Sequence, residues 1–358
     1  MGSWAFRRAT IDSIDALRNQ VRGVADIAQL SPGRLQGTLI HAAADGFESC
    51  VVERSPVATR SVGITPGGKQ VLSLVVSSSS RIAYWARDMA PGEMSVIAPG
   101  GPVEAYHEGR TSYAMLGLEP SELMASFGGE PRLRDPAFWS QRLLTLRVTS
   151  PSDAVERARR LTEILTSLRE APAPLSGDSL DFWRRSIVEI FTSLVSAAAP
   201  QERRDPVRNT ARLVREIEHY LQEQVFRPVH LSEICSHLNV SRRSLHRAFE
   251  EEMGIGPVTF LRRKRLSAVH MTLRQNAQQA RSVTDIALEH GFTELGRFAQ
   301  YYKELFGELP SQTLHGNAGG QPEERSVLGK SSAWSLRDVQ ADADGADIAR
   351  WTALGSRS

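Results

Sequence analysis

The stretch "LSEICSHLNV" at residues 231–240 decides the fold of the C-terminal part of this chain, because it recurs as "VTDIALEHGF" at residues 283–292. The apolar positions, a Ser or Thr at the second position and an acid at the third coincide. After one inserted residue the match resumes, with "LHRAFEEEMGIGP" (245–257) over "FAQYYKELFGELP" (298–310). One structural unit therefore occurs twice, about fifty residues apart.

Each unit has the pattern of a helix-turn-helix. The pattern predicts N-caps at Ser232 and Thr284, each followed by an acid that favours the start of a helix. Asn239 and Gly291 are predicted at the turns because both residue types tolerate a left-handed backbone. The second helices are expected to follow caps at Ser241 and Thr293. Their predicted core residues are Leu245 and Phe249 in the first unit and Phe298 and Tyr302 in the second.

The first two turns of the second helix in the first unit are rich in cations. A structural helix more often has acids in its first turn and cations in its last, because of the helix dipole. Here the charge pattern is reversed, which indicates that the helix binds a polyanion outside the protein. Arg, Ser and His are also side chains that reach base edges and phosphates when the N-terminus of a helix enters the major groove. The residues concerned are Ser241, Arg242, Arg243, Ser244, His246 and Arg247.

Between the two units, residues 257–275 predict one long helix with an apolar face at Phe260, Leu261, Leu266, Val269 and Leu273. Such a helix would hold two reading helices about one turn of DNA apart, roughly 34 Å, so that both meet successive major grooves. The run "RRKR" in this helix has two interpretations: a solvated cationic face, or side chains that pair inside the domain, as expected for its last arginine.

These features together resemble the AraC/XylS family of bacterial transcription regulators. The resemblance covers about residues 208–315, most specifically "DIALEHGF" and the following "YYKELFG" with its proline. It implies an all-α DNA-binding domain at residues 205–315 with two helix-turn-helix units, joined to a variable domain that senses an effector or mediates dimerisation. In the second reading helix it implies DNA contacts from Thr293, Glu294, Leu295, Arg297 and Gln300.

Two of these positions depart from the common pattern of the family. An arginine is frequent where Gln300 stands, and an aromatic residue or histidine is common where Arg297 stands. A reading helix with fewer cations is expected to contribute register and shape fit more than base discrimination. Glu294 has two open roles, as an acceptor for cytosine N4 or as a first-turn acid favoured by the helix dipole.

The N-terminal part has a different character. Short apolar or alternating runs separated by turns such as "TPGGK" and "APGGP" predict an antiparallel sandwich or small barrel, similar to cupin-like sensor domains. We therefore predict a multidomain α and β protein: a sensor or effector domain at 1–150 with a surface helix at 10–28, a helical dimerisation or linker region at 151–200, and a disordered tail at 316–358.

A small-molecule pocket in the N-terminal domain would use its aromatic residues, and Tyr84, Trp85, Tyr106 and Tyr113 are the candidates. The alternative class is a cupin-type enzyme or ligand-binding protein with an accessory helical interaction domain. That reading lacks support, since His41 and His107 are the only histidines before residue 200 and do not form a metal-ligand motif. We assign no catalytic residue, metal or cofactor.

Composition limits the remaining choices. The net charge is +2, so nucleic-acid binding must come from local arrangement. No apolar run approaches the ~18 residues of a membrane span, and the two cysteines, Cys50 and Cys235, are expected as free thiols. The expected setting is the cytoplasm, and the expected partners are double-stranded promoter DNA, a small effector, RNA polymerase and a second copy of the chain. The operator, the effector and the sign of regulation stay open, with an activator among the expected roles.

Overall fold

The protein was analysed as a computed structural model that describes residues 4–21, 24–65, 68–127, 130–139, 144–147, 150–171, 175–197, 209–224, 229–276 and 281–315. Residues Met1–Pro322 form one compact unit. The predicted disordered tail at 316–358 lies outside the described residues.

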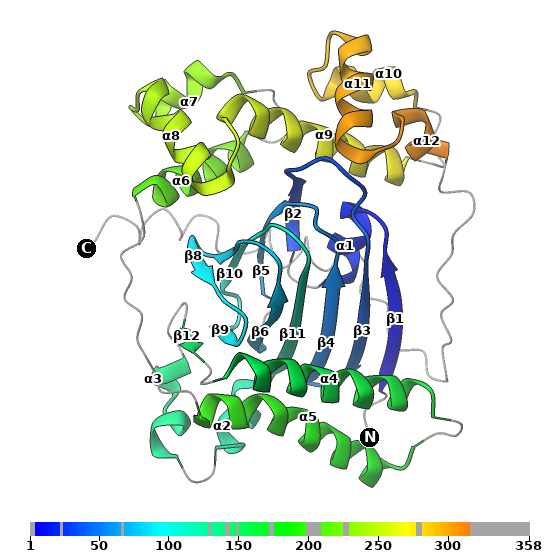
Figure 1. Cartoon of the computed structure of the whole chain (residues 1–358), viewed down its shortest axis with the longest axis vertical. Helices are drawn as coiled ribbons and strands as arrows, with labels where there is room; N and C mark the ends of the chain where they lie inside the picture. The colour runs from blue at the N-terminus through cyan, green and yellow to red at the C-terminus, as the bar shows by residue number, and fades with distance from the viewer. Residues whose placement is uncertain are drawn as a thin grey trace. The chain divides into compact units, whose positions relative to one another are not determined.

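Two antiparallel sheets make up the N-terminal part, as predicted (Figure 1). One has seven strands in the order β1-β3-β4-β11-β6-β9-β12, and the other has five in the order β2-β5-β10-β7-β8. The strands are β1 (Ala5–Ile11), β2 (Val24–Gln29), β3 (Gly37–Ala44), β4 (Phe47–Arg54), β5 (Thr59–Ile64), β6 (Gln70–Ser78), β7 (Ile82–Tyr84), β8 (Arg87–Met89), β9 (Glu93–Ile97), β10 (Pro102–His107), β11 (Thr111–Leu118) and β12 (Leu144–Arg147).

Strand β6 shows why this sheet is buried on both faces. Its side chains alternate, so Val71 and Val75 belong to an apolar cluster with β7, β9 and β10, whereas Leu72 and Leu74 belong to a cluster with α4 and α5. Helices α4 (Pro151–Arg169) and α5 (Gly177–Ala197) lie side by side against the seven-stranded sheet (Figure 1). Short helices α2 (Pro120–Ala125), η1 (Pro131–Arg134) and α3 (Pro136–Trp139) precede β12.

The predicted surface helix at 10–28 is wrong in its extent. The chain forms β1, then a two-turn helix α1 (Ile14–Gln20), then β2. Ile14, Leu17 and Val21 follow helical spacing and are buried, but this spacing covers only two turns. The Ser13 side chain caps α1 by accepting from the amide of Ala16, and residues on either side pair with β3 and β5. Strand pairing across the chain therefore overrode the local helical pattern.

The C-terminal part is all helical, as expected. Helices α7 and α8 form one helix-turn-helix unit and α10 and α11 form the other, at opposite ends of the long helix α9 (Figure 1). The helices are α6 (Asn209–Glu223), α7 (Leu231–His237), α8 (Arg242–Met253), α9 (Pro257–Gln275), α10 (Val283–Glu289), α11 (Leu295–Phe306) and α12 (Pro310–His315).

The predicted core and turns of both units are confirmed. Asn239 has φ 51° and Gly291 has φ 79°, so both turns use the left-handed backbone. Gly254 and Gly307 end α8 and α11 in the same conformation, at φ 64° and 72°. The four predicted core residues of α8 and α11 and the apolar face of α9 are buried: Leu245, Phe249, Phe298, Tyr302, Phe260, Leu261, Leu266, Val269 and Leu273.

Three predicted caps are wrong. Helix α7 is capped by His230 and α10 by Ser282, in each case two residues before the residue that we predicted. Each cap forms a capping box with the acid of its unit, Glu233 or Asp285. Both acids therefore lie near the start of their helix, as predicted. Helix α11 starts after Glu294 without a side-chain cap, whereas the cap at Ser241 is confirmed by its bond from the Ser244 amide (3.0 Å).

Candidate DNA-binding surface and effector cavity

The N-terminal half of α8 presents a row of exposed polar and cationic side chains. Leu245, Ala248 and Phe249 fix one face of the helix in the core of the first unit. The opposite face is therefore open to solvent, and the first described acid of α8 follows only at Glu250. The exposed residues are Ser241, Arg242, Arg243, Ser244, His246 and Arg247, as the charge pattern predicted.

Helix α11 exposes the equivalent positions with a different charge pattern. Phe298 and Tyr302 bury its inner face, and Leu295, although apolar, is 38% exposed. Arg297 pairs with Glu294 (3.1 Å) within the same turn, so its charge is already partly balanced. The sequence candidates on this helix are all exposed: Thr293, Glu294, Leu295, Arg297 and Gln300.

The opposite ends of both helices are held by the β-rich part of the chain. At the end of α8, Arg81 donates to the carbonyl of Glu252 (2.7 Å) and contacts its carboxylate (3.3 Å). At the end of α11, the carbonyl of Leu305 accepts from the Gly33 amide (3.0 Å) and from the Gln29 side chain (2.6 Å). Both reading helices are thus fixed at their C-terminal ends, which leaves their N-terminal turns free.

The four cations of the "RRKR" run in α9 contact other residues of the protein instead of forming a solvated face. Two stack on aromatic rings of the second unit and two bond to strand β2 or to the residue that follows it. Arg265 lies over the aromatic ring of Phe292, within the helical domain, as expected for the last arginine of the run. The contacts are Arg262 over Tyr301 (4.2 Å), Arg265 over Phe292 (5.3 Å), Lys264 with Asp26 (2.6 Å) and Arg263 with the carbonyl of Leu30.

A buried ion network joins β5 and β10 to α6. The guanidinium of Arg60 bonds to both carboxylate oxygens of Glu218 (2.8 and 2.6 Å) and to Glu104 (3.1 Å), and Arg215 also contacts Glu104 (2.8 Å). Arg60, Glu104 and Glu218 are all buried. Burial alone would lower the pKa of Arg60, but the two carboxylates raise it above its ordinary value, so this arginine stays charged.

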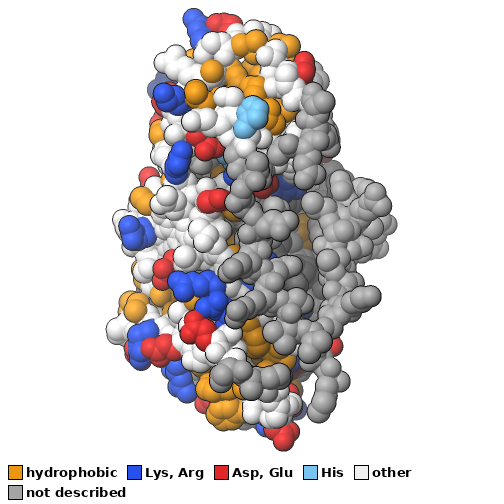
Figure 2. Space-filling model, turned by 90° about the vertical axis from the view of Figure 1, so that its right-hand side faces the viewer, with side chains coloured by type: hydrophobic (Ala, Val, Ile, Leu, Met, Phe, Trp, Pro, Cys, Tyr) orange, Lys and Arg blue, Asp and Glu red, His pale blue; other side chains and the backbone are white. Residues whose placement is uncertain are grey.

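Over the part of the surface that Figure 2 shows and the structure describes, Lys and Arg side chains are interspersed with acidic ones instead of forming one basic surface. This distribution agrees with the net charge of +2. Sequence-independent attraction to DNA would therefore depend on the local cations at the start of α8.

A cavity of about 80 Å³ lies between the two sheets. Three of the four predicted aromatic residues line it: Tyr84, Trp85 and Tyr113. Tyr106 does not, because its side chain points to the other face of β10, where Arg81 lies over its ring (5.6 Å) and residues of α6 and α8 pack nearby. Other polar residues also line the cavity, among them His41, Cys50 and His107, which the sequence did not indicate as pocket residues.

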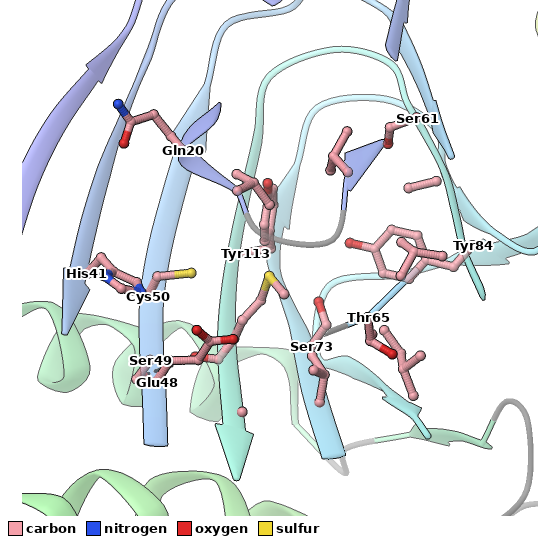
Figure 3. A pocket seen from close by; sticks show the side chains of 18 of the residues that line it. Gln20, His41, Glu48, Ser49, Cys50, Ser61, Thr65, Ser73, Tyr84 and Tyr113 are labelled. Carbon is pink, nitrogen blue, oxygen red and sulfur yellow. Dashed lines mark hydrogen bonds between the residues drawn. The ribbon is translucent and has the colours of Figure 1, made fainter. Parts of the chain in front are cut away.

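Alternation along the strands could have indicated some of these missed residues. Cys50 lies two residues before Val52 in β4, and Tyr113 pairs with Val52 across the sheet. Burial raises the pKa of the Cys50 thiol to about 12, with Glu48 adding to the shift, so the thiol stays protonated. Figure 3 shows the Cys50 thiol and the Tyr84 hydroxyl directed into the space between the sheets, with Tyr113 between them.

His107 is the most constrained polar group of this cavity. Its Nε2 lies 3.4 Å from the hydroxyl of Tyr84, and its ring stacks on Tyr113 at 5.6 Å. Burial, and then the charge of Arg54, holds its pKa well below the ordinary value, so the imidazole is neutral at pH 7.

The structure brings together no metal-ligand set within its described residues: no group of three or more His, Cys, Asp or Glu side chains could hold an ion there. The described helices also include none that is long and apolar enough to span a membrane. Cys50 and Cys235 are free thiols, Cys50 buried and Cys235 half-buried.

Two helix-turn-helix units at the ends of one helix define a double helix-turn-helix domain, the class of fold that presents two helices to one DNA duplex. The family described as "Helix-turn-helix domain" matches residues 234–316. The XylDLEGF operon transcriptional activator 2 of Pseudomonas putida is 39% identical over 95 residues, which cover 26% of this chain and 60% of the activator. Another P. putida XylDLEGF operon transcriptional activator is 38% identical over 95 residues, 26% of this chain and 30% of that protein.

A solved structure, a probable AraC family transcriptional regulator from Rhodopseudomonas palustris CGA009, is 34% identical, covering 30% of this chain and 97% of that one with a TM-score of 0.28. The C-terminal part of the chain is therefore a helix-turn-helix domain similar to that of these transcriptional activators. It spans only 60% and 30% of the two curated relatives' lengths.

Proposed function

We propose that the protein is a sequence-specific DNA-binding transcription regulator of the cytoplasm. The observation that carries this proposal is the exposed N-terminal half of α8, where Arg242, Arg243, His246 and Arg247 extend from a helix whose other end is anchored. A helix that enters the major groove with its N-terminus uses such side chains for guanine edges and phosphates. Helix α9 has 19 residues, or about 28 Å at 1.5 Å per residue, which is close to one turn of DNA.

The two reading helices have different roles in this proposal. Helix α8 supplies most of the affinity, because its cations are exposed and the one ion pair among them, Arg247 with Glu251 (3.6 Å), is exposed as well and easily exchanged for phosphate. Helix α11, with Arg297 beside Glu294 (3.1 Å), supplies register and contacts from Gln300.

The β-rich domain senses a small effector in the cavity between its sheets. Two features of the cavity wall support this role. Gln20, Val21 and Val24 belong to the segment that leads into β2, whose Asp26 pairs with α9. Tyr84 lies in β7, next to the Arg81 that holds α8. A ligand that shifts these walls would therefore act on the supports of both reading helices.

Dimerisation is proposed through α4 and α5. Val155 on α4 is 49% exposed and Phe182 on α5 is 61% exposed, so each helix presents a large apolar side chain to solvent. The buried face of α4 includes Ala154, Ala158 and Leu161, so Val155 lies outside it. Two protomers on repeated half-sites would raise the affinity through effective concentration. Contact with RNA polymerase stays a prediction from the resemblance, and no catalytic role is assigned.

Two substitutions test whether α8 contacts DNA. Replacing Arg243 or Arg247 by alanine is expected to weaken binding to the cognate site, which genome-wide mapping of bound DNA would supply. A bidentate contact to guanine gives a loss of about 1–3 kcal/mol in base discrimination. A phosphate contact instead lowers the slope of log affinity against log salt by about 0.9 per ion pair, with specificity retained. Mobility shifts on matched and mutated sites across a salt series separate the two.

Arg265→Gln is the matched control, since this arginine belongs to the same domain but stacks on Phe292. It is expected to leave both specificity and salt slope unchanged, with at most a loss of stability. Wild-type affinity and salt slope in both α8 variants would contradict the assignment of α8. A chain that recovers no enriched DNA sequence would contradict the proposed function as a whole.

A further inference from the structure

The cavity between the sheets is closed mainly by apolar surface. Its walls come from both sheets and from the segment after α1, so a bound molecule would touch all three. The apolar and aromatic lining residues are Val21, Val24, Val71, Tyr84, Trp85, Ile97, Val103, Ala105, Tyr113 and Met115. Surface of this kind favours a ligand that is largely apolar.

The lining itself offers no cation to an anion, and the buried Arg54, whose charge reaches His107, already donates to the Val57 carbonyl and the Thr59 hydroxyl. Among its described residues are no Lys or Arg, and the His107 ring is neutral. The one acid, Glu48, lies 3.7 Å from Lys69 and so already has a cation beside it. A charged ligand would have to leave water without a new ion pair, which costs several kcal/mol in apolar surroundings.

Two buried polar atoms of the cavity wall, Nδ1 of His107 and Oε1 of Gln20, have no hydrogen-bond partner among the residues that the structure describes. His107 itself is 4% exposed, and the two residues come from different walls. The glutamine oxygen can only accept, whereas a neutral imidazole nitrogen donates or accepts depending on the tautomer. A hydroxyl group, which both donates and accepts, is the smallest group that suits either atom. Leaving a buried polar atom unpaired is unfavourable.

Trp85 lines the cavity from a turn with a strained backbone. It has φ 48° and the next residue, Ala86, has φ 63°, so the turn between β7 and β8 holds two side-chain-bearing residues in the left-handed region. A bulky residue rarely adopts this conformation, and such strain gathers at ligand sites. Here it sets the indole against the cavity, where its Nε1 donates to the carbonyl of Pro102 (2.9 Å).

We propose that this cavity binds an uncharged, largely apolar molecule of about four to six non-hydrogen atoms with one hydroxyl group, which bonds to His107 or Gln20. The size follows from the volume of about 80 Å³, since about 10–15 Å³ on this measure holds one water. The inference rests on the proposed sensing role of the β-rich domain and names the ligand class of that same site.

The test compares probes of one shape and different charge on the full chain at pH 7.5. Cyclopentanol, cyclopentylamine and cyclopentanecarboxylate are titrated by calorimetry and by saturation-transfer NMR. Cyclopentanol is expected to bind with a Kd below about 1 mM, within the range for so few atoms. The ammonium and the carboxylate are expected to bind at least about tenfold more weakly because of their desolvation cost. Equal or tighter binding of either charged probe, or no binding of cyclopentanol, would overturn the inference.

A variant locates the hydroxyl contact. His107→Phe keeps a ring of similar size but cannot form a hydrogen bond, so it is expected to weaken cyclopentanol about fivefold while methylcyclopentane binds as before. His290→Phe, at a buried histidine of the helical domain, is the matched control and is expected to change neither Kd. If both probes weaken equally in His107→Phe, and Gln20→Leu leaves cyclopentanol unchanged, the hydroxyl contact is wrong.

Failure of this inference can be told apart from failure of the proposed function. The probe order is measured on the wild-type chain without DNA, so it decides the ligand class even if His107→Phe does not fold. Site-specific DNA binding in the mobility shift is measured without any probe. Intact DNA binding with no cyclopentanol binding overturns the ligand class alone.

Discussion

Replacing Arg60 by alanine is expected to lower the free energy of unfolding by about 3–5 kcal/mol. Arg60 bonds to Glu218 at 2.6 and 2.8 Å and to Glu104 at 3.1 Å, and all three residues are buried. Without the guanidinium, two carboxylates stay in a poorly solvated place with only Arg215 nearby. The loss therefore exceeds the net stabilisation by the intact network, because it includes the cost of buried unpaired charge.

Urea unfolding followed by circular dichroism measures this effect as a lower midpoint. Arg159→Ala is the matched control: this arginine also has two carboxylate partners, Glu156 and Glu163, but its side chain is 57% exposed. Exposed pairs contribute little, so no measurable change in the midpoint is expected. A midpoint of Arg60→Ala equal to that of Arg159→Ala would show that the buried network does not hold β5 and β10 to α6.

Acidification from pH 7 to pH 5 is expected to destabilise the protein through its buried neutral histidines, most clearly His270. Its ring stacks on Phe306 at 4.5 Å, and its Nδ1 lies 2.7 Å from the Tyr302 hydroxyl. Burial, and then the charge of Arg274, lowers its pKa from 6.5 to about 3. The unfolded chain therefore binds a proton that the folded chain excludes. This stabilisation is complete above about pH 6.5 and is lost as the pH falls towards 3.

The expected size is about 1.4 kcal/mol per pH unit below 6.5, or roughly 2 kcal/mol at pH 5. His270→Gln removes the titration and keeps a polar partner for Tyr302, so its free energy of unfolding should fall less between pH 7 and 5 than that of the wild type. His107 also contributes in both proteins, since its pKa is lowered as well. His315→Gln, at an exposed histidine of α12, serves as control. Parallel pH profiles for wild type and His270→Gln would contradict the assignment.

The helix-turn-helix domain could be predicted because the sequence pattern that specifies it is local and repeated. Helical spacing predicted a buried face with four core residues and an exposed position for Arg243, and the structure confirms both. The core residues are Leu245, Phe249, Phe298 and Tyr302. Turn positions followed from residue types that accept a left-handed backbone. Caps were predicted less well: Ser232 and Thr284 looked suitable, but each helix is capped two residues earlier, by His230 and Ser282. The residue that caps a helix depends on where the preceding segment joins the helix. Contacts elsewhere in the fold set that point, so the local sequence does not determine it.

The amino-acid sequence by itself determined the two helix-turn-helix units, the antiparallel β character of the first part and the cationic face of α8, because period and residue type set these features within a few residues. Only the tertiary structure decided the rest. It turned both ends of the predicted helix at 10–28 into strands, directed Tyr106 away from the cavity and His107 into it, and bound Lys264 to Asp26. Such outcomes depend on contacts between segments far apart in the chain, where pairing of strands and burial of charge outweigh local preference.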